Sequence, residues 1–330
     1  MSSRKRFAAK KLYASGPTVP ATSTPFADDP STRTPIVSTR RIVTRAALSL
    51  ALVGVLYISA KWKPQSASTS LAGVAESLTL RSQAVPCSED YVEERKLFSE
   101  CAPKKCGRLV SDSVVTANEV LVLLRIAQRG LSLGRSDGGA SILDLHSGSV
   151  SRGTKFANVY TLLKQKGKLL FTEEDLKVYR QVKIKIRSLI AFQFGATPES
   201  LHLTHPTFFS EMTDRPALTV HDQYWHVHVD KKTYGSFHYT SLLYLSNYAT
   251  DFDGGRLVFV DGASGNVTVE PKKGRVLAFT SGSENPHRVE QVERGVRYAL
   301  TVSFSCDPSK AIADPGTSSA AQAPNKRQDL

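Results

Sequence analysis

The stretch that follows Gly195 constrains the fold of this chain more than any other part of the sequence. About eight short runs of β-branched, aromatic and aliphatic residues follow one another there, and Gly, Pro, Asp and Asn separate them. The most regular runs are YTSLLYLS, RVLAFTS and RYALTVSFS. Many short strands joined by such turns are typical of all-β barrels and jelly rolls. The sequence therefore predicts a β barrel over residues 199–306.

Two helices are predicted upstream of this barrel. The run TANEVLVLLRIAQRG starts with a capping box, Thr116 and Glu119, and ends at Gly130. The run TEEDLKVYRQVKIKIRSLIAFQFG starts at Thr172 with acidic residues in its first turn, and it carries an apolar stripe. A glycine-flanked strand, DGGASILDLHSG, lies between them. We expect residues 86–198 to form a cysteine-containing segment whose helices support the barrel from outside.

The basic residues of the chain are concentrated near its N-terminus. The net charge is +13, yet residues 1–81 hold twelve Lys and Arg against three Asp and Glu. The remainder is close to neutral, so the charge does not indicate a nucleic-acid partner. Residues 1–41 contain few large apolar side chains and are expected to form a disordered basic tail. We also expect a polar stalk over 63–85 and a second disordered tail over 307–330.

A hydrophobic run over residues 42–62 lies between the basic tail and the predicted stalk. Its uncharged part, Ala46 to Ala60, would form a helix of about 22 Å, and Arg45 and Lys61 can extend it by snorkelling. We expect an uncleaved transmembrane signal anchor, with a cleaved signal peptide and a buried helix as alternatives. The excess of basic residues before the run predicts a type II membrane protein of the endoplasmic reticulum or Golgi, with a lumenal body.

The cysteines and one sequon are consistent with a lumenal body. All four cysteines follow the hydrophobic run: Cys87, Cys101, Cys106 and Cys306. An even count suits two disulfides in any of three pairings, while four free thiols and a zinc cluster are the alternatives. Asn266 begins the sequon Asn-Val-Thr and is predicted to carry an N-linked glycan.

The run YWHVHVD holds two histidines and an aspartate at alternate positions. In an extended strand such side chains share a face, so His226, His228 and Asp230 would lie on one side. An isolated His-x-Asp arises easily by chance, but His287 follows at the start of a late strand. Two imidazoles and one carboxylate on a β scaffold suit non-haem Fe(II), and a zinc hydrolase that uses the same histidines is an alternative.

The last predicted strand, GVRYALTVSF, carries a single basic residue. Alternation puts Arg297, Ala299, Thr301 and Ser303 on one face and larger apolar residues on the other. If the first face lines the barrel interior, Arg297 is a buried charge that needs an anionic partner. A dicarboxylate co-substrate would supply that partner through a bidentate pair. If this face is outside, Arg297 is an ordinary surface residue.

Five blocks of the barrel region resemble the prolyl 4-hydroxylase-type 2-oxoglutarate/Fe(II) oxygenases. They occur in order as HVHVD, YTSLLYLSNY, GGRLVF, PKKGRVLAF and PHRVEQVERGVRYALTVSF. The resemblance implies a mainly β fold with flanking helices and a double-stranded β-helix core of the jelly-roll or cupin type. It also implies a 2-oxoglutarate-dependent dioxygenase that uses Fe(II), 2-oxoglutarate and O₂, with L-ascorbate to restore oxidised iron. Gly254 and Gly255 are interpreted as turn residues.

The resemblance assigns roles to individual residues. Three residues match the iron ligands of these enzymes: His228, Asp230 and His287. Arg297 matches the basic residue that binds the distal carboxylate of 2-oxoglutarate, and Tyr244 matches a tyrosine that binds the same carboxylate. Thr301 is expected beside Arg297. His226 does not match a ligand and is expected to support the ligands or to face the substrate.

The resemblance also suggests a class of substrate. A lumenal barrel of this type implies hydroxylation of a residue in a protein of the secretory pathway, with release of succinate and CO₂. A catalytically inactive jelly-roll module that binds a partner is the alternative.

Overall fold

The computed structural model of this chain describes residues 39–61, 68–166, 170–262 and 265–315. The chain divides into two compact units at residue 64. The N-terminal unit contains helix α1 (Thr39–Lys61), and the larger unit contains every other described element.

Helix α1 covers the run in which we expected a signal anchor. Its first two turns contain Arg40, Arg41 and Arg45. Among the described residues, no helix is both long enough and apolar enough to cross a membrane. The prediction of a transmembrane helix over residues 42–62 is therefore not supported.

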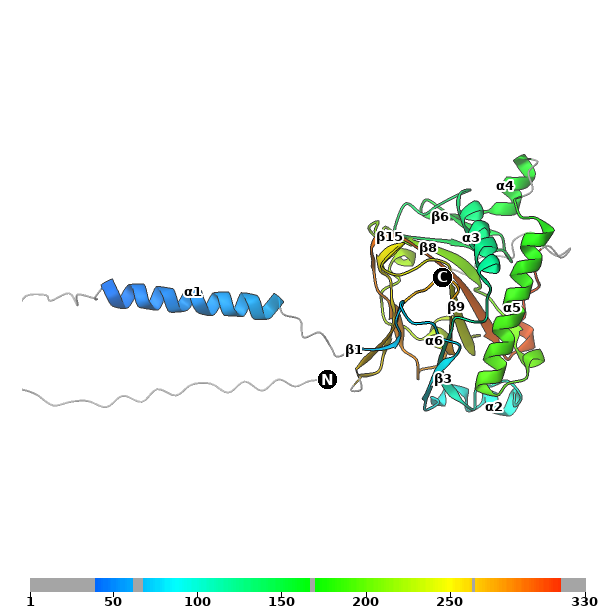
Figure 1. The fold of residues 1–330 in the computed structure, drawn as a ribbon, viewed down its shortest axis with the longest axis horizontal. Coiled ribbons are helices and arrows are strands. Elements are labelled where there is room, and N and C mark those ends of the chain that lie inside the picture. Colours follow the sequence, from blue (N-terminus) through cyan, green and yellow to red (C-terminus); the bar gives the residue numbers. More distant parts are fainter. Residues whose placement is uncertain (1–38, 62–67, 167–169, 263–264, 316–330) are drawn as a thin grey trace, which may run out of the picture. The chain divides into compact units, whose positions relative to one another are not determined.

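The larger unit is built on two β sheets (Figure 1). Within the described residues the minor sheet has four strands in the order β1-β12-β11-β14, which are β1 (Ser68–Ala72), β12 (Asn266–Val269), β11 (Leu257–Val260) and β14 (His287–Val289). The major sheet has the order β2-β3-β13-β9-β15-β8-β4-β5-β6, and β7 and β10 pair with β15. Its strands are β2 (Arg81–Val85), β3 (Cys106–Ser111), β4 (Ala140–Leu143), β5 (Ser149–Arg152), β6 (Lys155–Asn158), β7 (His202–Leu203), β8 (Phe208–Thr213), β9 (Tyr239–Tyr244), β10 (Phe252–Gly254), β13 (Val276–Thr280) and β15 (Val292–Ser305).

Two apolar layers hold this unit together. The first contains buried side chains from both sheets, such as Leu257 and Phe259 of the minor sheet and Leu277 of the major sheet. The second joins the major sheet to the long helices, and it includes Ile126 and Ile186. Each fully buried aliphatic or aromatic side chain contributes about 1.5–3 kcal/mol. The helices are α2 (Glu94–Leu97), α3 (Ala117–Leu131), α4 (Val159–Lys166), α5 (Glu173–Phe194) and α6 (Asp230–Tyr234).

The two predicted helices are confirmed, with ends close to those expected. The Thr116 side chain accepts from the backbone of Glu119, and the Glu119 side chain accepts in return, which forms the capping box of α3. Helix α5 has a capping box at Thr172 and ends at Gly195, whose φ of 75° is in the left-handed region that glycine tolerates. Helix α3 passes Gly130 and ends one residue later than predicted.

The predicted stalk over residues 63–85 is wrong from residue 68 onward. Strand β1 pairs in parallel with β12, and β2 pairs antiparallel with β3. Ser82 and Ala84 of β2 are exposed, while their neighbours are only half-buried. A strand at the edge of a sheet needs few apolar residues, so the small and polar composition did not reveal it.

The predicted C-terminal tail also begins too early. The first residues of the range 307–330 contact the larger unit, and Asp314 forms an ion pair with the buried Lys183 of α5. The carbonyl of Ala313 accepts a hydrogen bond from His146 at 2.7 Å. The fold therefore includes residues 307–315, and residues 316–330 lie outside the described residues, as do residues 1–38 of the predicted basic tail.

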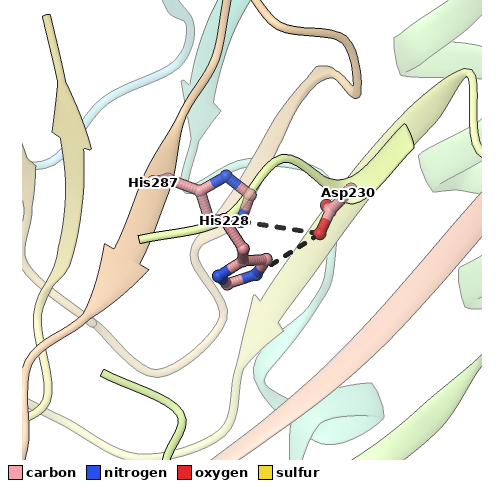
Figure 2. A group of neighbouring side chains, drawn as sticks. All are labelled: His228, Asp230 and His287. Carbon is pink, nitrogen blue, oxygen red and sulfur yellow. Dashed lines mark ion pairs between the residues drawn. The ribbon is translucent and has the colours of Figure 1, made fainter. Parts of the chain in front are cut away.

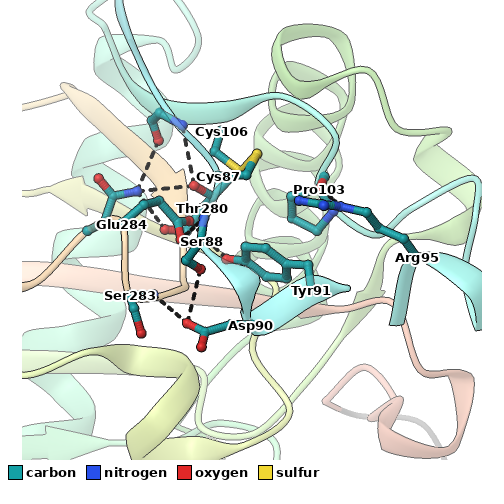
Figure 3. The surroundings of a disulfide bond; sticks show 12 residues. Cys87, Ser88, Asp90, Tyr91, Arg95, Pro103, Cys106, Thr280, Ser283 and Glu284 are labelled. Carbon is teal, nitrogen blue, oxygen red and sulfur yellow. Dashed lines mark hydrogen bonds between the residues drawn. A yellow bond between two sulfur atoms is a disulfide. The ribbon is translucent and has the colours of Figure 1, made fainter. Parts of the chain in front are cut away.

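All four cysteines form disulfides, which excludes the zinc-cluster and free-thiol alternatives. Cys87 pairs with Cys106, and Cys101 pairs with Cys306. The first bond ties the segment before α2 to the start of β3 (Figure 3). The second joins the residue after β15 to the segment that follows α2. The sequence predicted the number of bonds but not the pairing.

Candidate active site

The structure brings His228, Asp230 and His287 together, and we call these three residues the triad. One possible ligand atom from each lies within 4.8 Å of the others. The Asp230 carboxylate is 3.5 Å from His228 Nε2 and 3.7 Å from His287 Nε2 (Figure 2). Asp230 and His287 are buried, and His228 is half-buried. Three ligand atoms at this spacing can coordinate one metal ion and leave its other positions open.

The backbone that carries the triad differs from the predicted strand. His228 forms an isolated bridge with His287, but Asp230 begins helix α6, because the Val229 carbonyl accepts from the amide of Thr233. His226 is exposed and lies 3.1 Å from Gln223 through its Nε2 atom. The expectation that His226, His228 and Asp230 line up along one strand is therefore wrong, although His228 and Asp230 still converge.

Backbone carbonyls orient both histidine rings. His228 Nδ1 lies 3.0 Å from the carbonyl of His226, and His287 Nδ1 lies 2.9 Å from the carbonyl of Asn285. A carbonyl only accepts, so each Nδ1 carries the hydrogen and donates it. With the hydrogen on Nδ1, each Nε2, which faces the Asp230 carboxylate, is the ring atom that can bind a metal. This is the tautomer that a histidine needs to bind a metal through Nε2.

The charge states of Asp230 and His287 suit a cation. Burial alone would raise the pKa of Asp230, but His287, His228 and the hydroxyl of Thr240, which donates at 2.6 Å, together lower it. Burial lowers the pKa of His287, although Asp230 opposes this effect. For His228, burial lowers the pKa but Asp230 outweighs it, so the net shift is upward. The site therefore favours an ionised Asp230 beside a neutral His287, and these are forms that coordinate metal ions.

Arg297 lies in the same cavity as the triad. This cavity has a volume of about 400 Å³, and Thr301 lines it as well. Arg297 is 1% exposed, while Leu300 and Val302 of the same strand belong to the apolar layer beneath the helices. Of the two alternatives for the Arg297 face of β15, the structure shows the one in which it points into the barrel.

The guanidinium of Arg297 is only partly satisfied. Its Nε donates to the carbonyl of Gly255 at 2.9 Å, and its Nη1 lies 3.5 Å from the sulfur of Met212. Its Nη2 and the hydroxyl of Tyr244 are buried without hydrogen-bond partners among the described residues. The guanidinium carbon is 5.3 Å from the centre of the Tyr244 ring. Leaving such groups unpaired is costly, so this end of the cavity fits an anionic ligand.

The roles of two residues, one beside Arg297 and one in the lining of the cavity, were not predicted from the sequence. Gly255 was predicted as a turn residue, and its φ of 63° agrees, but it also holds Arg297. A Cβ atom on Gly255 would lie 2.9 Å from the Cδ of Arg297, so only glycine lets the two approach. Tyr224 lines the cavity, and its hydroxyl accepts from the amide of Val292 at 3.0 Å. Its place next to the HVHVD block was the available signal.

Comparisons with known proteins identify the family. Residues 216–305, which contain the triad and Arg297, match the family model of the 2OG-Fe(II) oxygenase superfamily. The chain is 56% identical over 245 residues to the 2-oxoglutarate and iron-dependent oxygenase domain-containing protein 3 of Xenopus tropicalis, which covers 74% of this chain and 77% of that protein. The chain belongs to the 2OG-Fe(II) oxygenase superfamily. The protein of the same name from Homo sapiens is 55% identical over 250 residues, with 74% of this chain and 78% of that protein covered.

Membership of this superfamily makes the chain a 2-oxoglutarate-dependent dioxygenase and implies Fe(II), 2-oxoglutarate and O₂. The mainly β core with flanking helices is consistent with the predicted double-stranded β-helix. A more distant relative is prolyl 3-hydroxylase 1 of Mus musculus, which is 30% identical over 231 residues. That match covers 63% of this chain and 29% of that protein.

Proposed function

We propose that this dioxygenase hydroxylates a residue of a protein substrate, with the triad as its iron ligands and Arg297 as its anchor for 2-oxoglutarate. The observation that carries the proposal is the partly unpaired Arg297 in the cavity that also holds the triad. A zinc hydrolase with the same histidines offers no role for the buried guanidinium of Arg297. A dicarboxylate co-substrate uses it directly, because one carboxylate can pair with Arg297 while the other end reaches the metal.

The residues around the two ends of the cavity have separate tasks. The triad binds the metal, and the hydroxyl of Thr240 holds the Asp230 carboxylate in place. Arg297 and the unpaired hydroxyl of Tyr244 bind the distal carboxylate of 2-oxoglutarate, and Thr301 lines the same space. When bound, Fe(II) and 2-oxoglutarate supply the oxidation by O₂ that yields succinate, CO₂ and a hydroxylated C–H bond. L-ascorbate restores Fe(II) after uncoupled turnover.

Two observations support a protein substrate. The cavity that holds the triad is also lined by Val220, His221 and Tyr234, and Val220 is largely exposed, so the lining continues to the surface. The name of the distant relative, prolyl 3-hydroxylase 1, refers to an amino-acid residue as the group that is modified.

We place the catalytic unit in the lumen of the endoplasmic reticulum or Golgi. Two disulfides support this proposal, because disulfides persist in oxidising compartments and are rare in the cytosol. The Asn266 sequon at the start of β12 also supports it, since N-linked glycans are added in the secretory pathway.

The test combines a chemical and a cellular measurement. Purified full-length protein supplied with Fe(II), O₂ and 2-oxoglutarate should form succinate, and zinc should not replace iron. His228→Ala should abolish both metal binding and succinate formation. Mass spectrometry of secretory-pathway proteins from cells that express the wild type or the His228→Ala variant should then reveal a 16 Da increase that requires the active enzyme. Iron-independent turnover would contradict the proposed chemistry, and a hydroxylated small molecule without any modified protein would contradict the proposed substrate.

A further inference from the structure

Arg108 of β3 is a fully buried cation near the triad, and the proposed reaction does not use it. Its Nη1 donates to Asp261 at 2.7 Å, and its guanidinium lies 4.0 Å from the centre of the Phe259 ring. The Phe259 ring in turn packs against the ring of His287, with 6.0 Å between their centres. Removing a charged guanidinium from water costs free energy even when it is paired with a carboxylate. We therefore asked what this buried arginine contributes to the site.

Asn285 connects this cation to His287. The side-chain oxygen of Asn285 accepts from Arg108 Nε at 2.7 Å, and its side-chain nitrogen donates to the carbonyl of Thr280 at 2.8 Å. The backbone carbonyl of the same residue accepts from His287 Nδ1 at 2.9 Å. Asn285 is 1% exposed. The residue that orients the His287 ring is therefore itself held by Arg108.

The loop that contains Asn285, residues 281–286, is also fastened from the N-terminal side. The Asp90 carboxylate accepts from the amide of Ser283 at 2.6 Å, and the hydroxyl of Tyr91 donates to Glu284 at 3.0 Å (Figure 3). The Cys87–Cys106 disulfide ties this N-terminal segment to β3, two residues before Arg108. Strand β3 and the segment attached to it thus form hydrogen bonds with three successive residues of the loop, Ser283, Glu284 and Asn285.

Within the described residues, the carbonyl that orients the other histidine of the triad is less buried. The carbonyl that orients His228 belongs to His226, which is exposed and whose side chain contacts Gln223. The orientation of the His287 ring is therefore fixed by buried contacts before a metal binds, whereas the orientation of the His228 ring depends on an exposed residue.

We propose that Arg108 is a positioning residue for His287, acting through Asn285. By holding the Asn285 carbonyl against Nδ1, it keeps the His287 lone pair directed at the metal position before the metal arrives. The proposal rests on the assignment of His287 as a metal ligand. Residues that orient a ligating histidine in this way typically change metal affinity 10- to 100-fold when they are removed.

The experiment measures cobalt(II) binding to the full-length protein, without turnover. Arg108→Gln and Asn285→Ala should each weaken cobalt(II) binding by about 10- to 100-fold. The cobalt(II) affinity of the double variant should be close to that of the single variant that binds less tightly. The two effects should not add, because both substitutions remove the same contact between Arg108 and Asn285. In the metal-free protein, ¹H–¹⁵N correlation spectra of the histidine side chains should show His287 with its hydrogen on Nδ1. In Asn285→Ala the other tautomer should become populated.

Arg275, the residue just before β13, provides a matched control. It is as fully buried as Arg108, and its Nε is 2.8 Å from the Asp112 carboxylate, but its described contacts do not include a triad residue. Arg275→Gln should lower thermal stability and leave cobalt(II) affinity unchanged. If Arg275→Gln weakens cobalt(II) binding as much as Arg108→Gln, the effect is general destabilisation and the proposal fails.

His287→Ala separates this proposal from the ligand assignment. If His287→Ala retains cobalt(II), the assignment of His287 is wrong and the positioning role falls with it. If His287→Ala loses cobalt(II) while the Asn285 and Arg108 variants bind within about twofold of the wild type, the ligand assignment stands and the positioning role fails alone. Should Arg108→Gln not fold, Asn285→Ala decides the question, because it leaves the Arg108–Asp261 ion pair intact.

Discussion

Replacing Arg297 by alanine tests the proposed co-substrate site most directly. The guanidinium is 1% exposed, and its Nε donates a hydrogen bond to the Gly255 carbonyl at 2.9 Å. Nη2 has no partner among the described residues, and Nη1 has only the sulfur of Met212. A carboxylate in the cavity can therefore accept up to two new charge-assisted hydrogen bonds from Arg297 without displacing an existing ion pair.

The size of the effect follows from these free donors. A hydrogen bond to a charged group contributes about 1.5–3 kcal/mol, and the two bonds of a fork are not fully additive. Arg297→Ala should therefore cost about 2–4 kcal/mol of binding free energy, which corresponds to a roughly 30- to 1000-fold higher KM for 2-oxoglutarate. Arg297→Lys should recover part of this loss, because it restores the charge but not the planar fork.

The assay is succinate formation against 2-oxoglutarate concentration, with bound iron measured in parallel. Arg294→Ala is the matched control, because Arg294 lies on the same strand, is exposed and pairs with Asp253. It should leave the KM for 2-oxoglutarate unchanged. An unaltered KM in Arg297→Ala, with iron retained, would show that another group holds the co-substrate and would refute the reasoning from unpaired donors.

Three further predictions follow from the site and its surroundings. Alanine at any position of the triad should abolish Fe(II) binding, whereas His226→Ala should retain it. Anaerobic iron titrations measure this binding. Loss of iron only in His226→Ala would show that the triad residues are not the iron ligands. Glycosidase treatment of cell-expressed protein should increase gel mobility, and Asn266→Gln should remove the shift; a wild-type protein with no shift would contradict the lumenal location. Burial lowers the pKa of His146 from 6.5 to about 4. Between pH 6.5 and about 4 the unfolded chain therefore binds a proton at His146 that the folded protein does not bind. The free energy of unfolding should fall as the pH drops through this range. Denaturant unfolding at several pH values should show a flatter dependence for His146→Gln, and an unchanged dependence would mean that His146 does not contribute.

The pattern of the last strand could be interpreted from sequence alone because it depends on a local rule. Alternation along β15 separates Arg297 and Thr301 from Leu300 and Val302, and the structure places the two sets on opposite faces as predicted. The same rule failed for YWHVHVD. There the chain enters α6 at Asp230, and hydrogen bonds around Val229, not side-chain polarity, determine that turn.

Other features depend on partners that are distant in the sequence. The disulfide pairing requires knowing that Cys101 lies near the end of β15, which no spacing indicates. Strand β1 has an exposed first half and is recognisable only through its pairing with β12, almost two hundred residues later. The support of His287 by Arg108 was equally hidden, because Arg108 reaches Asn285 only when β3 pairs with β13.

The position of β15 in the major sheet has a consequence for how the protein is made. Strand β15 lies between β9 and β8, and it also pairs with β7 and β10, yet it is the last strand of the described chain. During synthesis β8 and β9 emerge before β15. They cannot become part of one sheet, because the strand that pairs with both has not yet been made. The centre of the sheet can form only after β15 (Val292–Ser305) has been synthesised, and a chain that stops before Val292 lacks both Arg297 and the strand that carries it. Nascent chains of this protein therefore expose unpaired strand edges until translation is nearly complete, so folding should depend on chaperones that bind such edges.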